Sequence, residues 1–147
     1  MNYLDTSALI KRFVLERGRD WVLRVTDGTQ DVATATIAYV EIYSGLTRQK
    51  NRHFLTLRQY IAFCDRFEAD WVSYRHVHLT SEILQFGRDL IRRHGLRGAD
   101  SIHLASALEL RRALGEHVLF VAADGRLLGA AAAEGLETLN PETGKAL

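Results

Sequence analysis

Four acidic residues stand at places in the sequence where a carboxylate could do chemistry. Asp5 follows a short apolar run at the start of the chain, and Asp124 follows the apolar run VLFVA within two residues. Asp100 opens a segment with helical apolar spacing, and Glu41 lies inside another such segment. Because Glu is rarely buried without a partner, an acid among apolar neighbours suggests a function beyond solubility.

Carboxylates that share a partly dry pocket repel one another, so their pKa values rise unless cations are present. A hard divalent cation, Mg²⁺ or Mn²⁺, resolves this conflict because it prefers oxygen ligands and keeps several waters. The acids come without His or Cys ligands, which argues against zinc. An acidic metal site of this kind suits phosphodiester hydrolysis, in which the metal activates a water and neutralises charge on the phosphate.

Each acid also has a simpler interpretation. Asp5 and Asp100 stand where helices are expected to begin, so each could be only a cap or a favourable charge on a helix dipole. Glu41 could lie at the margin of its apolar stripe and reach water. The catalytic hypothesis therefore requires these side chains to meet in space.

Strands that alternate with helices would bring the acids together. The sequence predicts strands at 1–4, 31–34, 71–74, 118–122 and 136–139, and helices at 8–14, 21–25, 37–46, 54–69, 80–94, 98–110 and 126–133. This alternation implies right-handed βαβ units, and therefore an α/β fold with a parallel sheet between helical layers. The first and fourth strands are the most apolar and should be central. Asp5 and Asp124 would then share the sheet edge at which open α/β sheets bind ligands.

Length and composition fit one domain over residues 1–147. The chain is 47% hydrophobic and 25% charged with a formal net charge of +1, which neither demands nor excludes a nucleic-acid partner. The single cysteine, Cys64, permits no internal disulfide and fits a reducing compartment. The sequence has no basic leader with an apolar stretch and no apolar run of ~20 residues. We therefore expect a cytoplasmic protein that has no membrane partner.

Four sequence features occur in order over nearly the whole chain. They are LDTSAL at 4–9, Glu41, GADSIHLASA at 98–107 and FVAADGRLL at 120–128. In this combination the chain resembles the PIN-domain ribonucleases, most closely the VapC-type toxins of bacterial toxin–antitoxin pairs. The resemblance implies a three-layer α/β/α PIN-like sandwich with strand order 3-2-1-4-5, which agrees with the pattern of strands and helices.

The resemblance also implies a role for each acid. Asp5 and Asp100 correspond to the main Mg²⁺ ligands of the family, and Glu41 corresponds to the helix acid that helps to hold the metal. Asp124 corresponds to a fourth acid, often acting through water. Many relatives carry Thr or Ser where this chain has Ala122, so a hydroxyl that could orient water or phosphate is missing and a weaker metal site is expected.

Neighbouring polar and basic residues complete the expected site. Thr6 and Ser7 match the hydroxyls beside the first acid of the family. His103 could bond a carboxylate, with packing of the helix start as the preferred role and general base as the minor one. Three basic residues are candidates for contact with RNA phosphates, with a solvated helix face as the alternative for the arginines: Arg93, Arg97 and Lys11.

These observations predict a Mg²⁺-dependent endoribonuclease that acts as the toxin of a type II toxin–antitoxin system. The expected partners are an RNA substrate, a cognate antitoxin and a second copy of the chain, with a toxin–antitoxin hetero-oligomer as a further assembly. The alternative function is a PIN-fold module that binds RNA or protein with weak or no catalysis. A dinucleotide enzyme is disfavoured, because Asp5-Thr6-Ser7 stands where Gly-x-Gly-x-x-Gly would be needed.

Overall fold

A parallel five-stranded sheet forms the centre of the protein. The computed structural model describes residues 1–28 and 31–145. The strand order is β3-β2-β1-β4-β5, and every neighbouring pair is parallel. The strands are β1 (Asn2–Leu4), β2 (Val32–Ala35), β3 (Arg75–Val77), β4 (Leu119–Val121) and β5 (Glu137–Leu139). The predicted α/β class, the strand order and the central position of the first and fourth strands are confirmed.

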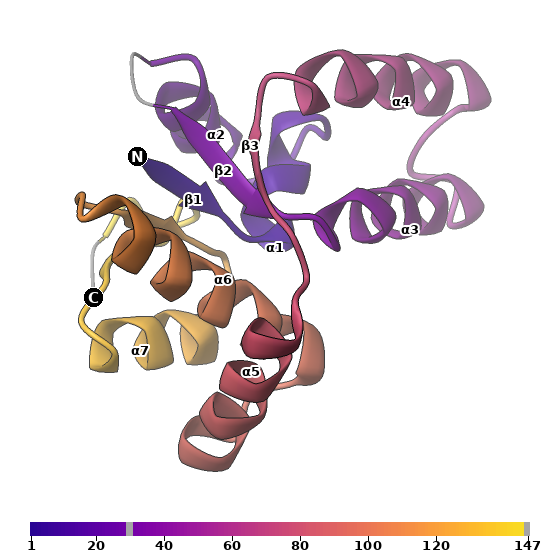
Figure 1. The fold of residues 1–147 in the computed structure, drawn as a ribbon. Coiled ribbons are helices and arrows are strands. Elements are labelled where there is room, and N and C mark those ends of the chain that lie inside the picture. The colour runs from indigo at the N-terminus through magenta and orange to yellow at the C-terminus, as the bar shows by residue number, and fades with distance from the viewer. Residues whose placement is uncertain (29–30, 146–147) are drawn as a thin grey trace.

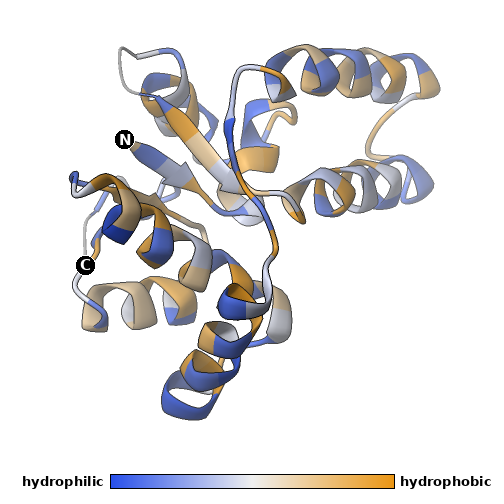
Figure 2. Cartoon of the chain, in the orientation of Figure 1, coloured by the Kyte–Doolittle hydropathy of each residue, from blue (hydrophilic) through white to orange (hydrophobic). Residues whose placement is uncertain are grey.

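Helices surround this sheet (Figure 1). They are α1 (Thr6–Leu9), the 3₁₀ turn η1 (Ile10–Arg12), α2 (Arg19–Thr26), α3 (Ala38–Asn51), α4 (Leu57–Trp71), α5 (Ser81–His94), α6 (Gly98–Leu114) and α7 (Gly125–Ala133). The α3–α4 hairpin extends to one side of the sheet, and α5 packs with α6 on another (Figure 1). Blue and orange stripes mark α3, α4 and α5 as amphipathic (Figure 2). No helix within the described ranges is both long and apolar enough to cross a bilayer.

Two apolar clusters hold the layers together, one on each face of the sheet. Successive side chains of a strand point to opposite faces, and β1 follows this rule. Tyr3 packs with Phe120 in the cluster under α5, α6 and α7. Leu4 packs with Val121 in the cluster under α1, α3 and α4. The strand that leads to the first acid is therefore fixed on both faces.

The third strand lies later in the chain than the sequence pattern predicts. Residues 71–74 are rich in aromatic and β-branched side chains, which favour strands, but Trp71 ends α4 and the strand begins at Arg75. The aromatic residues serve packing instead. The Trp71 ring stacks on His76 with 4.2 Å between ring centroids and meets Tyr74 edge-on at 6.4 Å. The expected strand 71–74 is therefore wrong by a few residues, because ring contacts between a helix end and a strand outweighed local propensity.

The helix starts near the sheet also differ from expectation. The helix expected at 8–14 is a single α-helical turn that continues as the 3₁₀ turn η1. Thr34, which directly precedes the segment expected to lead into the next helix, lies inside β2, and its hydroxyl donates to the Leu4 carbonyl at 2.8 Å. Helix α3 begins after Ile37 with no side-chain cap. Thr34 therefore ties two strands together rather than starting a helix.

Candidate active site

The ends of β1 and β4 place two of the acids at one edge of the sheet. The two strands pair in parallel with Leu4 opposite Val121. The backbone N–H of Asp5 extends this pairing by donating to the Val121 carbonyl at 3.1 Å. Asp124 follows β4 by three residues. The carboxyl ends of parallel strands are where open α/β sheets bind ligands, so both acids stand at the expected edge.

Asp5 is a buried carboxylate that also caps a helix. Its side chain is at the N-terminus of α1, and its Oδ1 accepts from the Ser7 hydroxyl at 2.7 Å and from the Ala8 N–H at 3.2 Å. Burial raises the pKa of Asp5, against the opposing effects of the nearby His103 and the Ser7 hydroxyl. Asp5 therefore does cap a helix, as the simpler interpretation expected. Its burial also makes the ionised carboxylate costly.

Ser7 joins the first acid to the loop of the fourth. Its hydroxyl donates to Asp5 and accepts from the Ala123 N–H at 2.8 Å. Asp124 comes next and caps α7, with Oδ1 accepting from the N–H groups of Arg126 at 2.8 Å and Leu127 at 3.0 Å. Both bonds use one oxygen of the exposed Asp124 carboxylate. Ser7 thus sets the position of the loop that presents Asp124.

Asp100 lies in the first turn of α6, and the charges of the other two aspartates affect its pKa. Its side chain is half-buried, and no described residue donates a hydrogen bond to it. Burial raises its pKa, and the charges of Asp124 and Asp5 raise it further, while Arg97 and His103 act in the opposite direction. The charges of Asp5 and Asp124 therefore both act on the Asp100 carboxylate.

Glu41 is held by hydrogen bonds rather than left at the margin of a helix. Its Oε2 accepts from the Thr6 hydroxyl at 2.6 Å and from His103 Nε2 at 2.8 Å. Burial would raise the pKa of Glu41, but the bonds from His103 and Thr6 outweigh it and lower the pKa. Thr6 follows Asp5 directly, and His103 lies three residues after Asp100. Glu41 is therefore tied to both main acids through their neighbours.

Tyr3 contacts this group, although it was not among the expected site residues. Its hydroxyl lies 3.1 Å from His103 Nδ1, and its side chain is fully buried. From the sequence, Tyr3 is only one apolar residue of the predicted first strand at 1–4. The available signal was weak: a buried tyrosine hydroxyl usually finds a hydrogen-bond partner.

The basic residues expected to contact RNA have different environments. Arg97 is exposed at the start of α6 and lowers the pKa of Asp100, which places its charge near the acids. Arg93 is half-exposed and pairs with Glu134 at 2.7 Å. Lys11 is 4% exposed and pairs with two acids of its own, so we do not retain it as a phosphate-binding residue. Although Lys11 lies close to Asp5 in sequence, its ammonium pairs with Glu16 at 3.0 Å and Glu142 at 2.7 Å.

The acids suit a hard cation that keeps some of its water ligands, rather than one that is bound by protein side chains alone. Among the residues that the structure describes, no three His, Cys, Asp or Glu side chains converge closely enough to form a ready metal cluster. The donors are oxygen atoms. Burial raises the pKa of Asp5 and of Asp100, and the neighbouring aspartates raise that of Asp100 further, so a nearby cation would favour the ionised carboxylates. Mg²⁺ is commonly held by one or two carboxylates while it keeps several waters. The donor set therefore suits Mg²⁺ or Mn²⁺.

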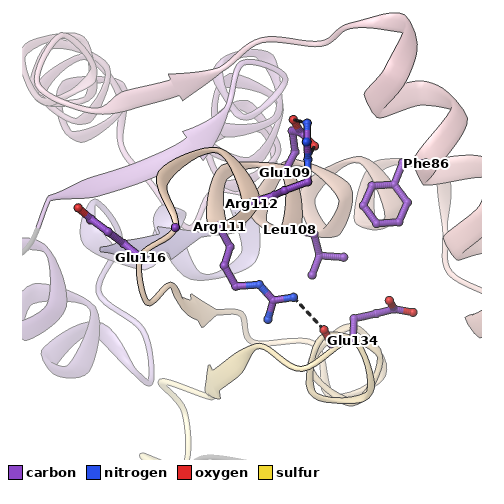
Figure 3. A pocket seen from close by; sticks show the side chains of 8 residues that line it. Phe86, Leu108, Glu109, Arg111, Arg112, Glu116 and Glu134 are labelled. Atoms are coloured by element: carbon purple, nitrogen blue, oxygen red, sulfur yellow. Dashed lines mark hydrogen bonds and ion pairs between the residues drawn. The ribbon is translucent and has the colours of Figure 1, made fainter.

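A wide cleft elsewhere in the described residues is separate from this site. A cleft of about 590 Å³ lies at the C-terminal end of α6, away from the end that carries Asp100. In Figure 3, Arg111 reaches across this cleft to the end of α7, where it donates to the backbone carbonyls of Glu134 and Gly135. None of the four acids lines it. Position at the strand ends, rather than cleft size, identifies the candidate active site.

Known proteins share both sequence and fold with this chain. A family model described as PIN domain matches residues 3–132. The chain is 37% identical over 127 residues to Ribonuclease VapC45 of Mycobacterium tuberculosis, which covers 86% of this chain and 85% of that protein.

Solved structures show the same fold at low sequence identity. A structure of FitAcB from Neisseria gonorrhoeae superposes with a TM-score of 0.71 and 17% identity, and covers 96% of this chain and 98% of that one. A toxin–antitoxin complex from Klebsiella pneumoniae gives a TM-score of 0.65 and 18% identity over the same shares of the two chains. The chain therefore belongs to the PIN-domain family, as its resemblance to the VapC-type members predicted.

Proposed function

We propose that this protein is a Mg²⁺-dependent endoribonuclease and the toxin of a type II toxin–antitoxin pair. The observation that carries the proposal is geometric: Asp5 and Asp124 follow the paired ends of β1 and β4, and Glu41 is bonded to Thr6 and His103, which neighbour Asp5 and Asp100 in sequence. A relative that is 37% identical over most of both chains is named a ribonuclease. A PIN fold that only binds RNA or protein remains the competing function, since Ala122 supplies no hydroxyl beside the fourth acid.

Asp5 and Asp100 would hold the divalent ion directly, with Glu41 and Asp124 completing the acidic shell. When bound, such an ion activates a water for attack on phosphorus and offsets the charge that builds up on the phosphate. Ser7 orients the Asp5 carboxylate, and Thr6 and His103 orient that of Glu41. Because these donors are already in place, the carboxylates need little rearrangement when metal and substrate bind.

RNA would approach from the side of the site that carries Arg97. This guanidinium is exposed and lies near enough to affect the pKa of Asp100. A cation in this place can contact a substrate phosphate and offset the repulsion between RNA and the acids. Arg93 is a weaker candidate because Glu134 already neutralises it. The cognate antitoxin and a homodimer belong to the same proposal, supported by the VapC name of the relative and by the toxin–antitoxin complex that shares the fold.

Cleavage of RNA by paired aspartate variants tests the proposal. Wild-type protein should cleave single-stranded RNA only when Mg²⁺ or Mn²⁺ is added, and products should carry 5′-phosphate and 3′-hydroxyl ends. Asp5→Asn and Asp100→Asn should each remove the activity. The matched control is Asp65→Asn, which changes an exposed aspartate on α4 and should cleave at the wild-type rate. Wild-type rates in both site variants would refute the catalytic assignment, and RNA binding without cleavage by wild-type protein would favour the binding module.

A further inference from the structure

We propose that the core residue Tyr3 is a positioning residue that holds the Glu41 carboxylate in place through His103. The inference rests on the proposed function, because it gives Glu41 a part in metal binding. The three residues form a continuous path: the Tyr3 hydroxyl lies 3.1 Å from His103 Nδ1, and His103 Nε2 lies 2.8 Å from Glu41 Oε2.

The chemistry of the end groups fixes the direction of each bond. An ionised carboxylate can only accept, so His103 Nε2 must donate its N–H to Glu41. For the neutral imidazole, Nδ1 is then the acceptor and the Tyr3 hydroxyl is the donor. The phenol thereby stabilises the one tautomer of His103 that can donate to Glu41. Such partners of a metal-binding group commonly orient it and tune its affinity.

Packing alone does not require a hydroxyl at position 3. The Tyr3 ring stacks on Phe120 with 5.5 Å between centroids and an interplanar angle of 9°, and a phenylalanine ring could do the same. A buried hydroxyl without a partner costs free energy, and in Tyr3 that cost is offset by the bond to His103. Tyr74 is the useful contrast, because its hydroxyl is also buried but has no hydrogen-bond partner among the described residues.

The short segment from Tyr3 to Ser7 would then orient two acids at once. Ser7 donates directly to Asp5, and Thr6 donates directly to Glu41. Tyr3, which precedes Asp5 in sequence, also orients Glu41, but indirectly, through its bond to His103. The turn that joins β1 to α1 thus orients both the Glu41 carboxylate on α3 and the Asp5 carboxylate that follows β1. Thr6 and His103 both bond Oε2 of Glu41. Its other oxygen, Oε1, has no hydrogen-bond partner among the described residues.

The experiment compares Tyr3→Phe with the matched control Tyr74→Phe. The first readout uses metal-free protein and needs no activity: the ¹⁵N resonances of the His103 ring. In wild type and Tyr74→Phe, Nδ1 should resonate as a hydrogen-bonded acceptor, and in Tyr3→Phe it should move towards the position of an unbonded ring nitrogen. The second readout is Mn²⁺ affinity measured by titration, and the third is kcat and KM for RNA cleavage at saturating Mg²⁺.

Tyr3→Phe should bind Mn²⁺ about 10-fold more weakly and show a lower kcat with little change in KM. Tyr74→Phe should match wild type in all three measurements. An unshifted Nδ1 resonance, or unchanged Mn²⁺ affinity and kcat in Tyr3→Phe, would overturn the inference while leaving the proposed function intact. Failure of wild-type protein to bind Mn²⁺ or to cleave RNA would instead refute the proposed function, and the inference with it.

Discussion

Replacing Asp100 with Asn should stabilise the metal-free protein while removing its response to Mg²⁺. Burial and the charges of Asp124 and Asp5 raise the pKa of Asp100 in the folded chain. A carboxyl group with a higher pKa in the folded state binds more protons there than in the unfolded state. The free energy of unfolding therefore falls as pH rises from the unfolded pKa through the folded pKa. Above that window the ionised carboxylate costs stability, and the neutral amide of Asn avoids this cost.

The size of the Mg²⁺ response follows from ligand linkage. A ligand that binds only the folded state adds about 2.7 kcal/mol to the free energy of unfolding at 100 times its Kd. For a chain of 147 residues, each kcal/mol raises Tm by about 3 °C. The wild-type protein should therefore gain about 8 °C. Asp100→Asn should gain little at the same Mg²⁺ concentration, because a main ligand is missing.

Calorimetric melting curves from about pH 3 to about pH 8 check both parts of this prediction. In the absence of metal, Asp100→Asn should melt above wild type at neutral pH, and the two curves should converge as pH falls and the wild-type carboxyl protonates. Asp65→Asn, the exposed control, should follow wild type with and without Mg²⁺. The reasoning is refuted if Asp100→Asn melts below wild type at neutral pH without metal, or if it gains as much from Mg²⁺ as wild type does.

Three further variants probe the surroundings of the acids. Thr6→Val removes the donor of the 2.6 Å bond to Glu41; kcat should fall about 10-fold with the fold retained by circular dichroism, and an unchanged kcat would contradict an orienting role. Lys11→Met breaks a buried ion-pair network and should lower the free energy of unfolding by about 2 kcal/mol in urea titrations, while kcat/KM at low temperature stays at the wild-type value. A loss of RNA affinity in that variant would restore Lys11 as a substrate contact. Arg97→Ala should weaken RNA binding and reduce the slope of log affinity against log salt by about one. Arg93→Ala should change the slope less, because Glu134 already pairs with Arg93. Equal slopes in wild type and Arg97→Ala would exclude a phosphate contact.

The positions of the aspartates could be predicted because they depend on rules that act locally and on topology. Asp5 directly follows a buried strand, and Asp124 lies soon after another, so a parallel sheet with these strands adjacent brings them to one edge. Asp100 opens a helix, where a negative charge is favourable. These are short-range signals, and the structure preserves each of them.

The sequence indicated that His103 could bond a carboxylate, but which residues connect the acids could not be predicted, because they lie far apart in sequence. Glu41 and His103 are 62 positions apart, and Tyr3 and His103 are 100 apart. Their bonds depend on how α3 and α6 approach β1, which no local pattern specifies. Lys11 shows the opposite error. It lies near Asp5 in sequence, yet one of its ion-pair partners is Glu142, which is 131 positions away.

Anomalous scattering from crystals grown with Mn²⁺ tests the central claim most directly. The account predicts a Mn²⁺ peak bound by the carboxylates of Asp5 and Asp100 at the ends of β1 and the start of α6, with Glu41 and Asp124 facing it. The same crystals of Asp100→Asn should show a much weaker peak or none. A peak elsewhere on the protein, or empty density between Asp5 and Asp100 at saturating Mn²⁺, would contradict the account.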